Sequence, residues 1–279
     1  MKLKQYCYLM RLHKPIGLFL LLWPTLWALW LASHGVPAIK IMFIFMAGVL
    51  LMRSAGCVIN DVADQQVDPY VERTRDRPLA SGKMTNKEAL ILFFILLFLA
   101  FLLVLFLNRL TLLLACVGAT LAMVYPFLKR FTHLPQVGLG IAFAWGVPMA
   151  FAAVNNVIPI AAWEVFLAAV IWPIMYDTVY AMVDRHDDMT IGVKSTAILF
   201  GKQDRLIVGL LQAAFILVLV HIGYLFKLHQ IYFVGLFCAA MLFCYQQWLI
   251  RNRQPSDCFA AFLNNNWVGM IIFIGIALS

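Results

Sequence analysis

Long apolar runs fill most of the chain, and short polar segments separate them. Each run has about the 20 residues that a helix needs to cross the apolar core of a bilayer, which is roughly 30 Å thick. The predicted spans are residues 16–33, 39–59, 86–107, 110–128, 136–154, 163–182, 206–225, 231–250 and 260–278. We therefore expect an all-α polytopic membrane protein with nine transmembrane helices. The last span begins as a mixed polar and apolar segment and has the weakest signal.

The composition agrees with this pattern. Hydrophobic residues make up 64% of the 279 residues and charged residues only 12%, and a water-soluble core has no place for so much apolar surface. The net charge of +8 is explained by basic residues that flank spans, so we expect contact with membrane lipid and no nucleic acid partner. No P-loop and no G-x-G-x-x-G motif supports nucleotide binding. Basic N-terminal residues lead directly into a full-length span, so we expect no cleaved signal peptide.

Lysine and arginine are distributed unevenly between alternate connections. Seventeen fall on one side of the predicted membrane and only Lys40, Arg109 and Lys227 on the other. Basic connections stay in the cytoplasm. The sequence therefore predicts a cytoplasmic N-terminus, with the connections after the second, fourth, sixth and eighth spans on the same side.

The first candidate site is a polar cluster where the second span ends. Asn60, Asp61, Asp64 and Asp68 are spaced so that the carboxylates share one face of a helix or of its frayed end. Carboxylates this close repel each other unless a cation binds them. The spacing therefore predicts a metal site, and the alternative is a set of solvated loop charges.

A second acidic cluster follows the sixth span and contains Asp177, Asp184 and Asp188. Hard oxygen ligands in two sets suit Mg²⁺, which keeps several waters and is often completed by substrate phosphates. Histidine and cysteine at zinc-site spacing are absent from the sequence. Asp177 is equally well explained by a structural ion pair. The candidate metal ligands are Asn60, Asp61, Asp64, Asp68, Asp177, Asp184 and Asp188.

The two clusters occupy equivalent places in the predicted order of helices. Asp64 and Asp184 are 120 residues apart, and they follow the second and the sixth span. We expect one transmembrane domain, 1–279, that contains a four-helix pseudo-repeat, 1–134 and 135–258, with a ninth helix at 259–279. The repeat predicts that the two acidic ends face each other across one cavity.

Basic residues near the clusters indicate that the substrate is an anion. Aromatic residues near the clusters suit a reaction that passes through a carbocation. A metal-bound diphosphate is the natural leaving group, because the metal neutralises it as its bond to carbon breaks. Tyr125 and Tyr180 would stabilise an allylic cation with their ring faces, or they simply pack as interface anchors. The candidate cations are Lys14, Arg73, Arg77, Lys129, Arg130 and Lys194.

Arg53 lies inside the second span, two helical turns before Asn60 and roughly 10 Å deeper. An unpaired charge at such a depth costs about 3 kcal/mol or more. The side chain either snorkels to the interface or binds an anion inside the cavity, such as a substrate carboxylate.

Two motifs resemble the UbiA superfamily of intramembrane prenyltransferases. They are N-D-x-x-D-x-x-x-D at 60–68 and D-x-x-Y-A-x-x-D-x-x-x-D at 177–188. Further segments look like the bacterial members that prenylate 4-hydroxybenzoate. These are Lys14-Pro15-Ile16-Gly17, Leu22-Trp23-Pro24-Thr25, Arg73-Thr74, Arg77-Pro78-Leu79, Tyr125-Pro126, Lys129-Arg130 and Lys194-Ser195-Thr196.

The resemblance implies nine helices around a central cavity that opens to lipid. It implies Mg²⁺-dependent transfer of a long prenyl chain from polyprenyl diphosphate to carbon 3 of 4-hydroxybenzoate, a step of ubiquinone synthesis. The enzyme would lie in the bacterial inner membrane with its active site toward the cytoplasm. Arg53 would bind the benzoate carboxylate. The implied catalytic Mg²⁺–diphosphate set is Asp64, Asp68, Asp184 and Asp188 with Asn60, supported by Asp61 and Asp177.

Two alternatives remain at this stage. A transporter would also place carboxylates in a membrane protein, although here they gather at helix ends rather than at mid-bilayer. A prenyltransferase for another aromatic acceptor, such as a naphthoate, homogentisate or a haem, fits the same motifs. The sequence leaves open the donor length, the deprotonating base and the oligomeric state.

Overall fold

The computed structural model describes residues 2–279, and all the regular elements in this part of the chain are helical. The long or paired elements are α2 (Ile16–Ser33), α3 (Ile39–Asp64), α4 (Asn86–Val104), α5 (Arg109–Val124), α6 (Pro135–Ala144), α7 (Gly146–Asn155), α8 (Ile160–Val183), α11 (Asp204–Leu225), α12 (Gln230–Leu249) and α13 (Pro255–Ala277). The short ones are α1 (Lys2–Leu9), η1 (Asp68–Tyr70), η2 (Tyr125–Arg130), α9 (Arg185–Ile191), α10 (Thr196–Phe200), η3 (Gly201–Gln203) and η4 (Ile250–Asn252).

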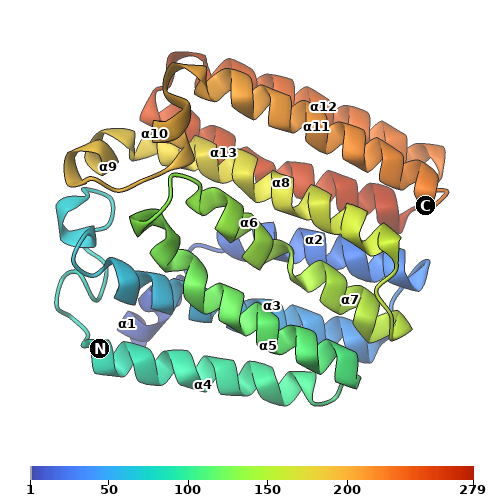
Figure 1. The fold of residues 1–279 in the computed structure, drawn as a ribbon, viewed down its shortest axis with the longest axis horizontal. Coiled ribbons are helices and arrows are strands. Elements are labelled where there is room, and N and C mark those ends of the chain that lie inside the picture. Colours follow the sequence, from blue (N-terminus) through green and yellow to red (C-terminus); the bar gives the residue numbers. More distant parts are fainter. Residues whose placement is uncertain (1) are drawn as a thin grey trace.

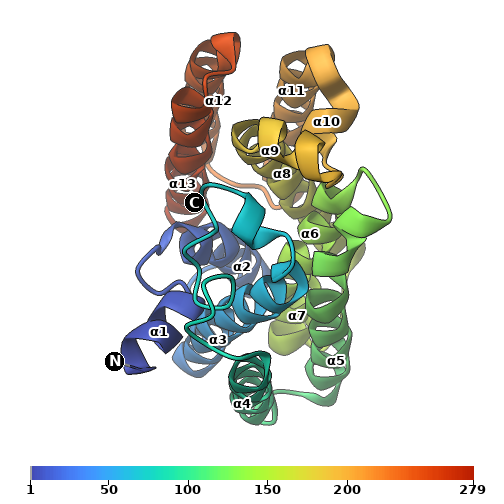
Figure 2. The same ribbon diagram turned by 90° about the vertical axis from the view of Figure 1, so that its left-hand side faces the viewer.

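Nine helical segments within residues 2–279 are long and apolar enough to cross a membrane. Each overlaps one of the spans predicted from hydropathy, so the all-α, nine-span prediction is confirmed. The segments run side by side along the long axis of the molecule (Figure 1). In the end-on view, α4 and α5 lie on one side of the bundle and α11 and α12 on the opposite side (Figure 2).

The second span continues beyond its predicted end at residue 59. α3 runs without interruption to Asp64, so Asn60, Asp61 and Asp64 belong to the last two turns of a membrane helix. The hydropathy pattern ends earlier because these polar side chains lower the local average while the backbone stays helical. The predicted frayed end is therefore regular helix up to Asp64.

The fifth span is divided into α6 and α7 at Trp145. Pro148 has no backbone N–H, and its ring would collide with the carbonyl of the residue four positions earlier, which is Ala144, the last residue of α6. The indole of Trp145 donates a hydrogen bond to the carbonyl of Leu114 in α5, at 2.8 Å. The break thus directs a large side chain toward the neighbouring helix.

The ninth span begins at Pro255, earlier than the predicted residue 260. Asn265, in its mixed segment, is buried and accepts a hydrogen bond from the indole of Trp172 in α8, at 3.2 Å. Trp172 also packs on Trp27 of α2 and on Phe215 of α11. The polar residues of α13 are therefore structural partners of a buried aromatic core.

The polar connections gather at one end of the bundle. α1, the α3–α4 connection (residues 65–85), α9 and α10 lie together at the left of Figure 1, whereas the last turn of α13 lies at the right. Both acidic clusters belong to that left end, because one ends α3 and the other ends α8. This end holds the candidate active site.

Candidate active site

One cavity of about 830 Å³ opens between the helices and reaches the polar end of the bundle. Its wall is made of apolar side chains deeper in the bundle and of charged side chains near the helix ends. The predicted site residues that line it are Lys14, Arg53, Asn60, Asp61, Asp64, Asp68, Arg73, Arg77, Tyr125, Lys129, Asp177, Tyr180, Asp184, Asp188 and Lys194. Two clusters separated by 120 residues of sequence thus border the same space.

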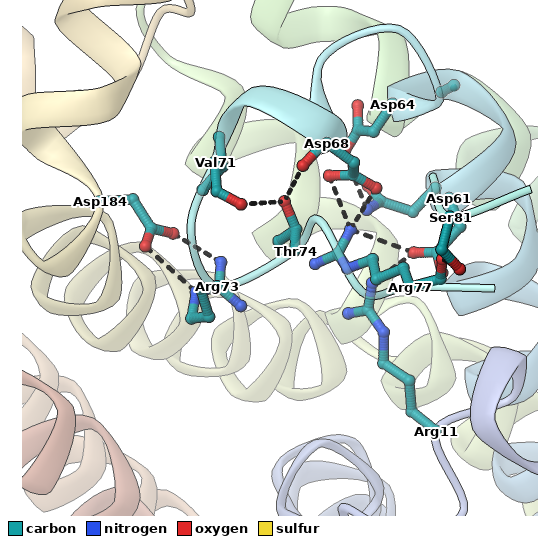
Figure 3. Close-up of polar contacts among 12 residues, drawn as sticks. Arg11, Asp61, Asp64, Asp68, Val71, Arg73, Thr74, Arg77, Ser81 and Asp184 are labelled. Atoms are coloured by element: carbon teal, nitrogen blue, oxygen red, sulfur yellow. Dashed lines mark hydrogen bonds and ion pairs between the residues drawn. The ribbon is translucent and has the colours of Figure 1, made fainter. Parts of the chain in front are cut away.

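Asp61 forms the most enclosed ion pairs of the site. Its side chain is 1% exposed, and its Oδ1 atom accepts hydrogen bonds from Arg11 at 2.5 Å and from Arg77 at 3.1 Å. Arg77 also binds Asp68 at 2.8 Å, so one guanidinium joins two carboxylates (Figure 3). Because both of its neighbours are arginines, Asp61 helps to position the cations of the site.

Asp64 ends α3 with two polar neighbours. The Asn60 amide donates to Asp64 Oδ2 at 3.1 Å from one turn earlier in the helix. Lys129 Nζ lies 2.5 Å from Asp64 Oδ1, as a charge contact without hydrogen-bond alignment. Lys129 comes from η2, so the ends of α3 and of the fourth span meet at this carboxylate.

Arg73 joins the two acidic clusters. It donates to both carboxylate oxygens of Asp184, at 3.1 and 2.5 Å, in a bidentate pair. Its guanidinium lies 4.7 Å from the ring centre of Tyr180, one turn before Asp184 on α8. Since Arg73 belongs to the α3–α4 connection, this pair fastens that connection to the end of α8 (Figure 3). Tyr180 therefore supports a guanidinium with its ring face.

The α3–α4 connection is also stabilised by a hydrogen bond within the connection itself. Thr74 is buried, and its hydroxyl donates to the carbonyl of Asp68 at 2.9 Å. This bond closes the turn between Asp68 and Thr74. It holds Arg73 and Arg77 on either side of one threonine, pointing toward different acidic clusters.

The acidic residues at the cavity mouth are strongly influenced by burial. Burial raises the pKa of the Asp188 carboxyl to about 7, and the charge of Asp184 adds to the rise. Burial likewise raises the pKa of Asp68, although Arg77 opposes the change. A carboxyl with such a pKa gains most from the arrival of a cation, because the cation stabilises its charged form.

The basic residues create an excess of positive charge at the same place. Burial, followed by the charges of Arg73, Arg11 and Arg77, lowers the pKa of Lys14 below its usual value. Lys14 therefore faces other cations without enough carboxylate to balance them. A polyanion such as a diphosphate would relieve this repulsion.

Arg53 lies deeper, on the face of α3 that lines the cavity. Among residues 2–279, no carboxylate lies within ion-pair distance of its guanidinium. The guanidinium packs against Gly17 of α2, where an added Cβ would lie only 2.4 Å from Arg53 Nη2. The absence of a side chain at Gly17 thus makes room for a partly buried cation.

The donor set fits a cation that is completed by its substrate. Within residues 2–279, no three His, Cys, Asp or Glu side chains converge on one point as in a closed metal site. Carboxylate and amide oxygens surround the cavity mouth instead, with basic side chains between them. Mg²⁺ usually keeps several waters and binds through a few carboxylates together with substrate phosphates, and this arrangement suits that mode.

Two site residues differ in role from the sequence-based interpretation. Arg130 does not line the cavity; its guanidinium donates to the carbonyl of Ala63 at 2.5 Å and so satisfies a free carbonyl at the end of α3. Arg11 does line the cavity and binds Asp61, but in the sequence it looks like one more topology-determining charge. Arg11 precedes Asp61 by 50 residues in the sequence, so the sequence spacing does not indicate that the two residues pair.

Comparison with known proteins agrees with the geometry. A sequence model of the UbiA prenyltransferase family matches residues 21–272. The chain belongs to this family. It is 57% identical over 278 residues to a 4-hydroxybenzoate octaprenyltransferase of Coxiella burnetii, covering 100% of this chain and 97% of the relative. It is 56% identical to a protein of the same description from Klebsiella pneumoniae, covering 100% and 96%.

Solved structures of UbiA homologues share the fold. A homologue from Aeropyrum pernix K1 superposes with a TM-score of 0.82 at 26% identity, covering 94% of this chain and 97% of that one. A homologue from Archaeoglobus fulgidus, bound to GPP and Mg²⁺, superposes with a TM-score of 0.73 at 16% identity, covering 99% and 100%. Membership of the UbiA prenyltransferase family sets the transporter alternative aside.

Proposed function

We propose that this protein transfers an octaprenyl-length chain from polyprenyl diphosphate to carbon 3 of 4-hydroxybenzoate, a membrane step of ubiquinone biosynthesis. The full-length identity to 4-hydroxybenzoate octaprenyltransferases carries the proposal. The geometry adds two independent features. A mixed acidic and basic mouth suits a metal-bound diphosphate, and a partly buried arginine without an acidic partner suits an acceptor carboxylate.

The diphosphate would bind at the cavity mouth. Arg73 and Lys129 already face the cavity as partners of Asp184 and Asp64, and each would exchange a carboxylate contact for a phosphate oxygen. Lys14, Arg77 and Lys194 would add charge around the same anion. The residues that would hold Mg²⁺ are Asn60, Asp64, Asp68, Asp184 and Asp188. When bound, Mg²⁺ neutralises negative charge that develops on the departing diphosphate.

The acceptor would bind deeper, with its carboxylate on Arg53. Charge-assisted hydrogen bonds to a guanidinium hold a carboxylate in a fixed orientation. Arg53 is two helical turns from Asn60, which separates acceptor and diphosphate by roughly 10 Å along α3. That spacing leaves room between them for the ring and for the reacting carbon of the donor.

The isoprenoid tail would follow the apolar wall made by α4 and α5. Leu97, Phe101 and Val104 of α4 line the cavity, and Phe101 is also 46% exposed. An apolar wall with such exposure lets a long tail extend toward lipid. Donor length would therefore be limited weakly by the protein itself.

The reaction would begin when the bond between the allylic carbon and the diphosphate oxygen breaks. The apolar wall excludes water from the resulting cation, and Tyr125 presents a ring to the same space. The acceptor carbon ortho to the hydroxyl then attacks, forming the new carbon–carbon bond. The displaced ring proton passes to the departing diphosphate or to a nearby aspartate, and aromaticity returns.

The charge distribution supports the proposal that this chemistry takes place on the cytoplasmic side of a bacterial inner membrane. The polar end of the bundle carries the connections that are rich in lysine and arginine. A water-soluble acceptor and Mg²⁺ would enter there, whereas the lipid-soluble donor would arrive through the bilayer.

The proposal is tested with purified protein in detergent, octaprenyl diphosphate, Mg²⁺ and an isotope-labelled acceptor. We expect labelled 3-octaprenyl-4-hydroxybenzoate from 4-hydroxybenzoate, and little product from homogentisate or a dihydroxynaphthoate offered in parallel. Absence of product from 4-hydroxybenzoate, or preference for another acceptor, would contradict it.

A further inference from the structure

Tyr176 of α8 carries a hydroxyl that the site described above leaves without a role. Its side chain is 3% exposed, and among residues 2–279 no group makes a hydrogen bond to its Oη atom. Tyr232, the other buried tyrosine within residues 2–279, donates to the carbonyl of Leu219 at 2.9 Å. The two residues also differ in position: Tyr176 lines the cavity and Tyr232 does not.

A buried hydroxyl is normally paired, and leaving one unpaired costs about 1–3 kcal/mol. Such a group in a cavity wall is explained when its partner arrives with the ligand. The unpaired hydroxyl of Tyr176 shares its cavity with the unpaired guanidinium of Arg53. Arg53 and Tyr176 thus line one cavity. Within residues 2–279, no carboxylate pairs with the Arg53 guanidinium, and no group makes a hydrogen bond to the Tyr176 hydroxyl.

The ring of Tyr176 is held firmly. It makes an edge-to-face contact with Trp172, with ring centres 5.5 Å apart and an interplanar angle of 88°, and a second with Phe262 at 5.9 Å. Trp172 is itself fixed by its hydrogen bond to Asn265. The ring is therefore held in one orientation in the cavity wall, and a fixed orientation is the requirement for selective recognition of a polar group.

We propose that Tyr176 forms the subsite for the phenolic hydroxyl of the aromatic acceptor. The acceptor hydroxyl donates a hydrogen bond to Tyr176 Oη while the acceptor carboxylate binds Arg53. This bond draws the proton away from the acceptor oxygen and increases electron density at the ring carbon ortho to it. The inference rests on the proposed function and adds the residue that distinguishes a hydroxylated benzoate from benzoate itself.

The test compares the binding of two labelled acids, 4-hydroxybenzoate and benzoate, by equilibrium dialysis. Mg²⁺ and an unreactive prenyl diphosphate analogue complete the site. One net hydrogen bond predicts that wild-type protein binds 4-hydroxybenzoate about five- to tenfold more tightly. Tyr176→Phe keeps the ring and its contacts, so it should bind benzoate normally while the preference falls to about one. Tyr232→Phe removes a buried hydroxyl elsewhere and should keep the full preference.

The outcomes separate the subsite from the proposed function. Equal affinity of wild-type protein for both acids overturns the subsite, even if Tyr176→Phe fails to fold. Retention of the preference in Tyr176→Phe overturns it as well. Failure of wild-type protein to bind either acid would instead refute the acceptor assignment on which the subsite depends.

Discussion

At the scale of single residues, the site depends on where charges lack their usual partners. Arg53 is partly buried, with its guanidinium against Gly17 and no carboxylate within ion-pair distance in residues 2–279. Asp188 has a carboxyl whose burial favours the protonated form. Both arrangements cost free energy in the protein alone, and both gain when an ion of opposite charge binds.

Replacing Gly17 by alanine tests the space reserved for Arg53. The new Cβ would lie 2.4 Å from Arg53 Nη2, so the guanidinium must move. Losing one charge-assisted hydrogen bond predicts a rise of about tenfold or more in KM for 4-hydroxybenzoate, with little change in KM for the prenyl diphosphate. Steady-state kinetics measure both. Gly209→Ala in α11 is the control, because Gly209 does not line the cavity and its Cβ would make only an ordinary contact, 3.5 Å from Gln247 Nε2. Equal effects of the two variants would contradict this account.

The pKa of Asp188 predicts a pH-dependent stability. Its folded-state pKa, about 7, is above the ordinary aspartate value of about 4. The folded protein therefore loses stability as pH rises from about 4 toward 7, because the unfolded chain ionises there before the folded protein does. Asp188→Asn removes that loss. Without Mg²⁺, we expect the variant to have a higher Tm than wild type at pH 8 and a smaller difference in Tm at pH 5. A Tm difference that is independent of pH would show that Asp188 titrates in its ordinary range.

At the scale of elements, the site is assembled by the ends of helices that are distant in sequence. The ion pair of Arg73 with Asp184 and that of Lys129 with Asp64 each join two such ends. Thr74 closes the turn that aims Arg73 and Arg77 at different clusters. The α3–α4 connection is thus ordered by its polar contacts.

Replacing Arg73 by alanine should loosen the α3–α4 connection. The bidentate bond to Asp184 and the contact with the Tyr180 ring are its attachment to α8. We expect hydrogen exchange in peptides from residues 65–85 to quicken several-fold, with little change in α12. Arg75→Ala is a matched control from the same connection, since Arg75 is exposed. Identical exchange in both variants would mean that the connection is held by other contacts.

Hydropathy predicted the spans well, because a bilayer requires continuous apolar helices. Hydropathy could not predict the extension of α3 to Asp64, because polar residues of a helix that face a cavity lower the local hydropathy just as loop residues do. It also missed the break at Trp145, because a proline inside an apolar run does not always interrupt the helix; α8 contains Pro173 and is continuous.

The charged residues that line the cavity were largely predictable as a group, because carboxylates and arginines are scarce in this chain. Their partners were not. Arg11 looks like a topology signal until the fold brings it to Asp61, and Arg130 looks like an anion ligand until it is seen on the carbonyl of Ala63. Tyr176 is one of many aromatic residues in apolar spans, and only its unpaired hydroxyl in the cavity wall distinguishes it.

At the scale of the whole molecule, an odd number of spans should separate the two termini across the membrane. Nine spans lie within the described residues, and the basic connections predict a cytoplasmic N-terminus. A green fluorescent protein fused to the N-terminus should fluoresce. The same protein fused to the C-terminus should be exported and should not fluoresce. Alkaline phosphatase at the C-terminus should be active. The opposite pattern would place the active site outside the cytoplasm.

The central claim is that the two acidic clusters form one Mg²⁺-dependent site for the diphosphate. The most direct measurement is the rate of 3-octaprenyl-4-hydroxybenzoate formation by Asp64→Asn and by Asp184→Asn, each purified and compared with wild type at saturating Mg²⁺. If both clusters act on the same leaving group, either substitution alone lowers the rate by about a thousandfold, equivalent to roughly 4 kcal/mol of transition-state stabilisation. Near-normal turnover by either variant would contradict the account.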